Sequence, residues 1–253
     1  MKMGNGAIRP ESAADRPPKR KPIDRVVGQL DHLSTVNIER QQPTTLLVPL
    51  GATEQHGPHL PLGTDTFIAH RWATAVAGLL PEAVVAPPLP FGSSGEHQAF
   101  PGTLSIGHAA LSLVLIELTR SAGHWADRVV FLSGHAGNLE PVRAATDQLR
   151  IEGHDVYYFV PAWSVDLGFT VDAHAGRTET SLMLHLEPDQ VGADLVAGQT
   201  APLSELLEEM KRAGVAAVSP SGVLGDPSAA SSGEGLDLFQ TLVASTVATI
   251  ERL

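Results

Sequence analysis

Short apolar runs alternate along the chain with segments in which apolar residues recur at helical spacing. The apolar runs predict strands at 44–50, 83–89, 128–132 and 155–160. The helical spacing predicts helices at 66–80, 109–121, 139–151, 178–186, 203–213 and 236–253, with a loop at 219–235. Strands that alternate with helices predict an α/β protein of three layers, α/β/α, around a mostly parallel sheet.

The domain organisation follows from the same pattern. Residues 1–25 are rich in proline and charge and lack the apolar stretch of a secretory signal, so we expect a disordered N-terminal arm. We expect residues 26–253 to form one domain. No apolar run reaches the ~18 residues of a membrane span.

Composition excludes several classes of function. The net charge is −11 and no basic stripe offsets it, so we expect no nucleic-acid partner. The chain has no cysteine, which excludes disulfides, thiolate metal sites and a cysteine nucleophile. We expect a cytoplasmic protein without membrane contact. No Gly-x-Ser-x-Gly, Gly-x-Gly-x-x-Gly or P-loop motif occurs, which disfavours a serine hydrolase and a nucleotide-binding protein.

Ionisable side chains follow each predicted strand. In open parallel sheets ligands bind beyond the carboxyl ends of the strands, so side chains there should converge on one edge. In chain order these residues are Glu54 and His56, Glu96 and His97, His135, and His174 and Glu179.

The segment GATEQHGPHLPLGTD, residues 51–65, has the strongest chemical signal. Its glycines and prolines indicate a shaped loop that contains Glu54, His56, His59 and Asp65. Carboxylate and imidazole in this mixture suit Zn, Fe(II), Mn or Co. Each residue alone fits an ordinary role, such as Asp65 capping the next helix, but together they favour a metal site.

Three further segments carry candidate residues. His135 lies between glycines in FLSGHAGN, where Asn138 could cap the following helix. In DAHAGRTETS, Thr178 could be a helix cap that places Glu179 in the first turn. We interpret residues 91–103, with Glu96 and His97, as a loop that faces the substrate.

These blocks resemble the creatininase family. The matching residues are EQHGPHLP at 54–61, Thr64 and Asp65, GHAGN at 134–138 and HAGRTETS at 174–181. The resemblance implies a creatininase-like α/β/α fold, a dinuclear metal centre, hydrolysis of amide bonds and a homo-oligomer. It also implies that Glu54, His56, Asp65 and His135 are metal ligands, with Asp65 bridging two ions.

One position departs from creatininase itself, which has a glutamate two residues after the ligand histidine. Here that position is Gly137, so the resemblance leaves creatinine hydrolysis in doubt. Glu179 is the substitute ligand that we predict. His174 is a candidate to stabilise the tetrahedral intermediate or to protonate the leaving amine, or else it orients a ligand carboxylate.

A closer resemblance, at residues 91–107, 174–186 and 214–227, is to a peptidase group of this family. The resemblance implies action on a ribosomal peptide, from which a C-terminal dipeptide derived from Val and Tyr is released, with Fe(II) and/or Zn(II) as cofactor. Glu96, His97 and Arg177 are then candidate substrate contacts. The alternatives are a creatininase-like hydrolase of a small formamide or lactam and a metal-bound scaffold without catalysis.

Overall fold

The computed structural model describes residues 28–160 and 172–253, so the N-terminal arm predicted at 1–25 lies outside the described part. The single domain at 26–253 stays a prediction. In the described part of the chain, no helix combines the length and apolar character needed to cross a membrane. The main elements are α1 (Thr35–Gln41), β1 (Thr45–Leu50), α2 (Thr64–Leu79), β2 (Ala83–Val85), α3 (Gly107–Ala122), β3 (Arg128–Ser133), α4 (Leu139–Ile151), β4 (Asp155–Phe159), α5 (Arg177–Leu186), α6 (Leu203–Ala213) and α7 (Ser232–Ile250).

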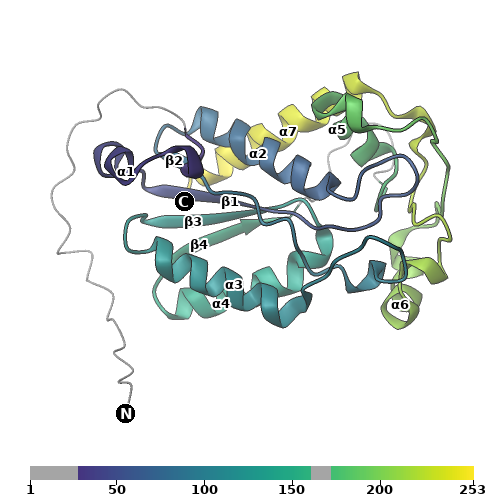
Figure 1. The fold of residues 1–253 in the computed structure, drawn as a ribbon, viewed down its shortest axis with the longest axis horizontal. Helices are drawn as coiled ribbons and strands as arrows, with labels where there is room; N and C mark the ends of the chain where they lie inside the picture. The colour runs from purple at the N-terminus through teal and green to yellow at the C-terminus, as the bar shows by residue number, and fades with distance from the viewer. Residues whose placement is uncertain (1–27, 161–171) are drawn as a thin grey trace, which may run out of the picture.

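The strands form a parallel sheet in the order β2-β1-β3-β4. Helices α2 and α7 cover one face and α3 and α4 cover the other (Figure 1). Every residue of β1 is buried, as expected for a central strand covered on both faces. The predicted three-layer α/β/α fold is therefore confirmed.

Alternation along β1 divides the core between the two faces. Leu46 and Val48 pack with α3 and α4, whereas Leu47 packs with α2 and α7. On the second face, Trp72 of α2 donates from Nε1 to Thr246 Oγ1 of α7 at 3.1 Å. The two layers together hold the carboxyl ends of β1 and β3 rigidly, and the loops that follow these strands carry the candidate residues.

The second strand is shorter than its apolar run predicts. It ends at Val85, because Pro87 and Pro88 lack the N–H groups that a ladder needs. The chain nevertheless continues beside β1. Leu89 donates from its backbone N–H to Pro49 O at 3.0 Å and accepts from Gly51 N at 2.9 Å.

Two helices differ from the predicted pattern. Helix α1 was not predicted, and it begins with a capping box in which Ser34 and Asn37 bond reciprocally. Helix α7 begins at Ser232 inside the segment predicted as loop, because the Ser231 side chain accepts from Glu234 N. Local capping therefore outweighs the weak apolar periodicity at both helix starts.

Candidate metal centre

The loop after β1 buries Glu54 and His56 completely. Glu54 donates its backbone N–H to Leu62 O at 3.0 Å, and Gly57 turns the chain at a φ of 65°. His56 Nδ1 lies 3.1 Å from the backbone oxygen of Glu54. A carbonyl oxygen only accepts, so Nδ1 carries the proton and Nε2 faces the cluster.

Asp65 lies in the first turn of α2, as predicted, where the positive end of the helix dipole favours a carboxylate. Its Oδ1 is 3.2 Å from His56 Nε2. The loop after β3 approaches this turn so closely that a Cβ on Gly134 would lie 2.3 Å from Asp65 O. Glycine at position 134 therefore lets His135 approach Asp65.

His135 joins the loops after β1, β2 and β3. Its Nε2 lies 3.1 Å from Ser93 O, and its Nδ1 lies 3.2 Å from Glu54 Oε1. Asn138 supports this arrangement without capping α4. Its side chain accepts from Ser93 N at 2.8 Å and donates to Gly51 O at 3.1 Å. Asn138 thus occupies the N-cap position of α4, but its side chain makes no capping hydrogen bond, because its amide ties the loops together.

Glu179 enters the cluster from the first turn of α5. Its Oε2 accepts from Ala175 N at 2.6 Å, and Ala175 has a φ of 50°, in the left-handed region. Thr178 does not cap this helix. The carboxylate of Asp172 accepts from the backbone N–H groups of Arg177 and Thr178 instead. Glu179 is thus in the first turn, as expected, but a different residue supplies the cap.

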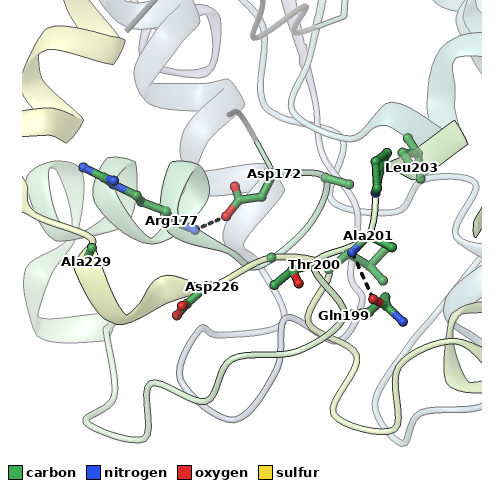
Figure 2. Close-up of a pocket in the computed structure, with 12 residues that line it drawn as sticks. Asp172, Arg177, Gln199, Thr200, Ala201, Leu203, Asp226 and Ala229 are labelled. Carbon is green, nitrogen blue, oxygen red and sulfur yellow. Dashed lines mark hydrogen bonds between the residues drawn. The ribbon is translucent and has the colours of Figure 1, made fainter. Parts of the chain in front are cut away.

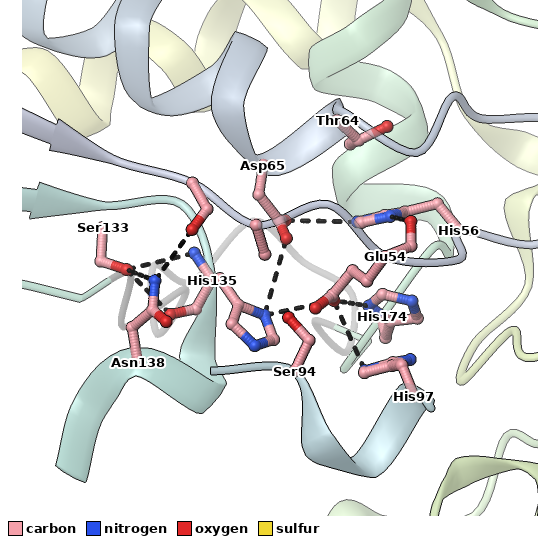
Figure 3. A network of polar contacts seen from close by, with 12 residues as sticks. Glu54, His56, Thr64, Asp65, Ser94, His97, Ser133, His135, Asn138 and His174 are labelled. Atoms are coloured by element: carbon pink, nitrogen blue, oxygen red, sulfur yellow. Dashed lines mark hydrogen bonds and ion pairs between the residues drawn. The ribbon is translucent and has the colours of Figure 1, made fainter. Parts of the chain in front are cut away.

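The loops bring these side chains together in sets that could each hold a metal ion. Figure 3 shows Glu54, Asp65 and His135 of one such set. We call Glu54, Asp65 and His135 the sheet-edge triad, because they surround the ends of β1 and β3. We call His56, Asp65 and Glu179 the α5 triad. In each set the candidate ligand atoms lie within 4.8 Å of one another, and Asp65 belongs to both. A third set joins Glu54 and His56 to His174.

The buried oxygens of the cluster fit a cation. Both carboxylate oxygens of Glu54 and Oδ2 of Asp65 have no hydrogen-bond partner among the described residues. Burying a carboxylate without compensation is costly, so such groups normally pair with a charge or coordinate a metal. Carboxylate and imidazole together suit a divalent transition metal. The residues present therefore fit the metal that the sequence predicts.

Charges within the cluster shift several pKa values. Burial lowers the pKa of His56 and His135, but the surrounding carboxylates outweigh it and raise both to about 10. Burial raises the pKa of Glu179 to about 7. Burial also opposes ionisation of Glu54, but His135, His97 and His174 hold its pKa well below the ordinary value. Protons and a metal ion therefore compete for the same nitrogens and oxygens.

Glu96 and His97 lie beside the cluster, as predicted for the loop after β2. Glu96 Oε1 is 3.5 Å from His135 Nε2, and 30% of the Glu96 side chain is exposed. His97 is buried, with Nε2 3.4 Å from Glu54 Oε1. Glu96 therefore borders the open side of the cluster, whereas His97 belongs to its interior.

Arg177 belongs to neither triad. It forms an ion pair with Glu234, from Nε to Oε2 at 2.9 Å. It also lines a pocket of about 350 Å³ with Asp172, Gln199 and Asp226 (Figure 2). No member of either triad lines this pocket. The structure thus places Arg177 beside a neighbouring cavity, and its contact with substrate stays a prediction.

Sequence reasoning missed Gln55, which is buried between the two strongest candidate ligands. Its amide lies 2.8 Å from His97 Nδ1, and the same nitrogen is 3.1 Å from His174 Nε2. The available signal was its position between Glu54 and His56. A neutral amide is not a ligand that transition metals prefer, so the search for metal ligands passed over it.

The chain is similar to known proteins along most of its length. Residues 31–250 match the family model described as "Creatininase: Creatinine amidohydrolase". The chain is 49% identical over 236 residues to the "Mycofactocin precursor peptide peptidase" of Mycobacterium ulcerans (strain Agy99), covering 90% of this chain and 92% of that protein. It is 52% identical over 217 residues to the protein of the same name from Mycolicibacterium smegmatis, covering 82% of this chain and 84% of that protein.

A solved structure gives the same result for the fold. The structure titled "Creatininase Mn" superposes with a TM-score of 0.75 at 27% identity, covering 89% of this chain and 98% of that chain. Together with the family match over most of the sequence, this likeness confirms the creatininase-like fold that the motifs predict. The chain belongs to the creatininase family of hydrolases.

Proposed function

We propose that this protein is a metal-dependent peptidase that acts on the mycofactocin precursor peptide and releases its modified C-terminal dipeptide derived from Val and Tyr. The observation that carries the proposal is the similarity to two peptidases of that name over most of their length. The site has the side chains that hydrolysis of an amide bond requires. A cluster of carboxylates and imidazoles lies at a sheet edge, and Glu96 borders its open side.

The two triads divide the task of holding metal. The sheet-edge triad would hold one divalent ion and the α5 triad a second, and Asp65, which belongs to both sets, would contribute to both. Glu179 supplies the fifth ligand side chain and a third negative charge, which Gly137 cannot provide. Bound ions of this kind lower the pKa of water to near 7 and polarise a carbonyl oxygen.

We propose that His174 moves a proton at Nδ1. Its Nε2 lies 2.7 Å from the backbone oxygen of Gln55, so Nε2 carries the ring proton. Burial, together with the positive charge on His56, holds the pKa of His174 well below its usual value. The neutral ring therefore directs an unprotonated Nδ1 at the cluster, where it accepts a proton from water and delivers it to the leaving amine.

Gly137 favours the peptide over creatinine as substrate. A Cβ at this position would lie 2.3 Å from His135 Nε2 and 2.5 Å from Glu96 Oε1. Glu96 therefore occupies space that a side chain at 137 would need. The site of this chain differs here from that of creatininase, in which a glutamate follows the ligand histidine by two residues.

Mass spectrometry of the cross-linked precursor peptide incubated with Fe(II)- or Zn(II)-loaded protein tests the proposal. We expect loss of the C-terminal dipeptide, and no cleavage after chelation. Creatinine, a formamide and a lactam are assayed in parallel under the same conditions. An intact peptide together with rapid hydrolysis of one of these small amides would overturn the proposal in favour of a small-amide hydrolase.

Other parts of the account stay predictions. Iron or zinc as the resident metal, a homo-oligomeric assembly and a cytoplasmic location rest on the family resemblance and on composition. Elemental analysis of protein purified without added metal, together with light scattering, would test the first two. Substrate contacts at Glu96 and Arg177 are tested by replacing each with alanine and measuring KM for the peptide.

A further inference from the structure

The histidines of the cluster differ in the hydrogen bonds of their outer ring nitrogens. In each ring, the inner nitrogen faces the carboxylates of the cluster and the outer nitrogen is the other one. Three histidines place the outer nitrogen against a backbone carbonyl oxygen. These contacts are His56 Nδ1 with Glu54 O at 3.1 Å, His135 Nε2 with Ser93 O at 3.1 Å, and His174 Nε2 with Gln55 O at 2.7 Å. Because carbonyl oxygens only accept, each outer nitrogen carries a proton. When a metal ion displaces the second proton from His56 and His135, the inner nitrogens of the rings would direct lone pairs at the cluster, as in metal-binding histidines.

His97 has the opposite arrangement, because a side-chain amide faces its outer nitrogen. Gln55 Oε1 accepts from Gly57 N at 2.9 Å, which fixes the orientation of the amide. The two hydrogens on Gln55 Nε2 then have two acceptors, His97 Nδ1 at 2.8 Å and Gly222 O at 3.1 Å. His174 Nε2 is also near, but its own proton is donated to Gln55 O. His97 Nδ1 is therefore an acceptor.

The proton on His97 consequently lies on the inner nitrogen. An imidazole ring always holds at least one proton, and Nδ1 accepts from the Gln55 amide and carries none. Nε2 carries that proton and lies 3.4 Å from Glu54 Oε1. The same oxygen is 3.2 Å from His135 Nδ1, which would carry no proton when it binds a metal ion. With a metal ion bound, His97 thus presents a donor to Glu54 and His135 does not.

We propose that His97 is a positioning residue that donates Nε2–H to the Glu54 carboxylate once a cation is bound, across a 3.4 Å contact that does not have hydrogen-bond geometry in this structure, and that Gln55 fixes the proton on that nitrogen. The inference rests on the proposed function in taking Glu54 as a metal ligand. It replaces the substrate contact that the sequence predicts for His97. A donor on one lone pair of a carboxylate restricts its rotation and leaves the remaining lone pairs for the ion. His97 is then a donor beside the metal site, and not a fourth histidine ligand.

Matched substitutions of His97 distinguish three roles for this residue, namely hydrogen-bond donor, metal ligand and packing residue. His97→Gln places an amide N–H near the position of Nε2, whereas His97→Met fills the space without a donor. We expect His97→Met to weaken zinc affinity by about 10- to 100-fold. We expect His97→Gln to stay within about threefold of the wild type, since the donor is kept. Competition with a chromophoric chelator measures the affinity, and His108→Met, at an exposed histidine of α3, is the control.

Nitrogen NMR of zinc-loaded protein labelled with ¹⁵N-histidine tests the proton position directly. We expect a protonated Nε2 and an unprotonated Nδ1 for the ring whose signals disappear in His97→Gln. In Gln55→Met, which removes the amide donor, we expect the other tautomer to appear, and no change in Gln98→Met. A proton on His97 Nδ1 in the wild type would overturn the proposal.

Two outcomes of the affinity measurements would also contradict the role proposed for His97. Equal loss of affinity in His97→Gln and His97→Met, with fewer zinc ions per chain, would make His97 a ligand. Unchanged affinity in His97→Met would make it a packing residue. None of these readouts needs the peptide. Failure to cleave the peptide with the expected affinities would therefore count against the proposed function alone.

Discussion

The sheet-edge triad and the α5 triad share Asp65 but are held by different parts of the fold. Glu54 and His135 follow neighbouring central strands, and Asn138 ties their loops together. Glu179 instead depends on the first turn of α5. The sheet therefore builds one half of the site, whereas packing of a helix completes the other.

The contact between α5 and α7 explains how the second half is fixed. Ser181 of α5 donates from Oγ to Glu234 Oε2 at 3.0 Å, and a Cβ on Gly235 would lie 1.8 Å from Ser181 O. A helix held by side-chain packing opens more easily than a loop between central strands. We therefore expect the sheet-edge triad to bind its ion more tightly than the α5 triad.

We expect the largest effect from a substitution of Asp65, the residue that both triads share. Asp65→Asn should lose both ions and reduce peptide turnover by about a thousandfold or more, since no carboxylate remains between the two sets. Elemental analysis and the peptide assay measure the two effects. Asp147→Asn, at an exposed position on α4, is the matched control. Retention of both ions in Asp65→Asn would show that the two triads do not share a ligand.

Glu179→Gln addresses the α5 triad alone and keeps the size of the side chain. We expect metal content to fall toward one ion per chain and turnover to fall by about a hundredfold or more. The melting temperature of the chelated protein should change little. Glu208→Gln on α6, where the side chain is 89% exposed, is the control. Two ions and a normal rate in Glu179→Gln would make Glu179 structural, and Glu96 would be the next carboxylate to test.

His174→Ala should leave both triads loaded and slow only the proton transfer. We expect kcat to fall by about a hundredfold, at the lower end of the range for general acid–base catalysis, with metal content unchanged. Single-turnover kinetics with metal analysis measure the two quantities. If His174→Ala lost an ion, the third set, Glu54 with His56 and His174, would be a real metal site.

The smallest expected effect concerns the stability of the metal-free fold as the pH changes. Each triad contributes one histidine to this effect, and we expect the two contributions to be similar. His56 and His135 each have a pKa of about 10 in the fold, against 6.5 ordinarily. Folding without metal therefore takes up protons, so the stabilisation is present below pH 6.5 and is lost as the pH rises to about 10.

Thermal denaturation of chelated and zinc-loaded protein from pH 6.5 to 10 measures this effect. We expect the melting temperature of the chelated protein to fall by about 5 °C or more than that of the loaded protein. His56→Gln and His135→Gln should each reduce the difference by a similar amount. Parallel pH profiles of the chelated and loaded proteins would show that the two histidines are not protonated in the fold.

The sheet-edge triad is easier to predict from the sequence than the α5 triad, whose position depends on helix packing. Buried strands have a strong apolar signal, and a polar residue directly after such a strand must lie at the sheet edge, which locates Glu54 and His135. The cap of α5 was missed, because Asp172 reaches its N–H groups through a turn rather than from the expected Thr178. The role of Gln55 depends on partners up to 167 residues away, which no local pattern encodes.

Anomalous X-ray diffraction from crystals of the zinc-loaded protein, measured at the zinc edge, locates the bound ions relative to the two triads. We expect two anomalous peaks per chain, one in contact with Glu54 and His135 and one in contact with His56 and Glu179. Asp65 should contact both, because it belongs to both triads. A single peak in contact with all five side chains, or a second peak away from Glu179, would contradict the two-triad account.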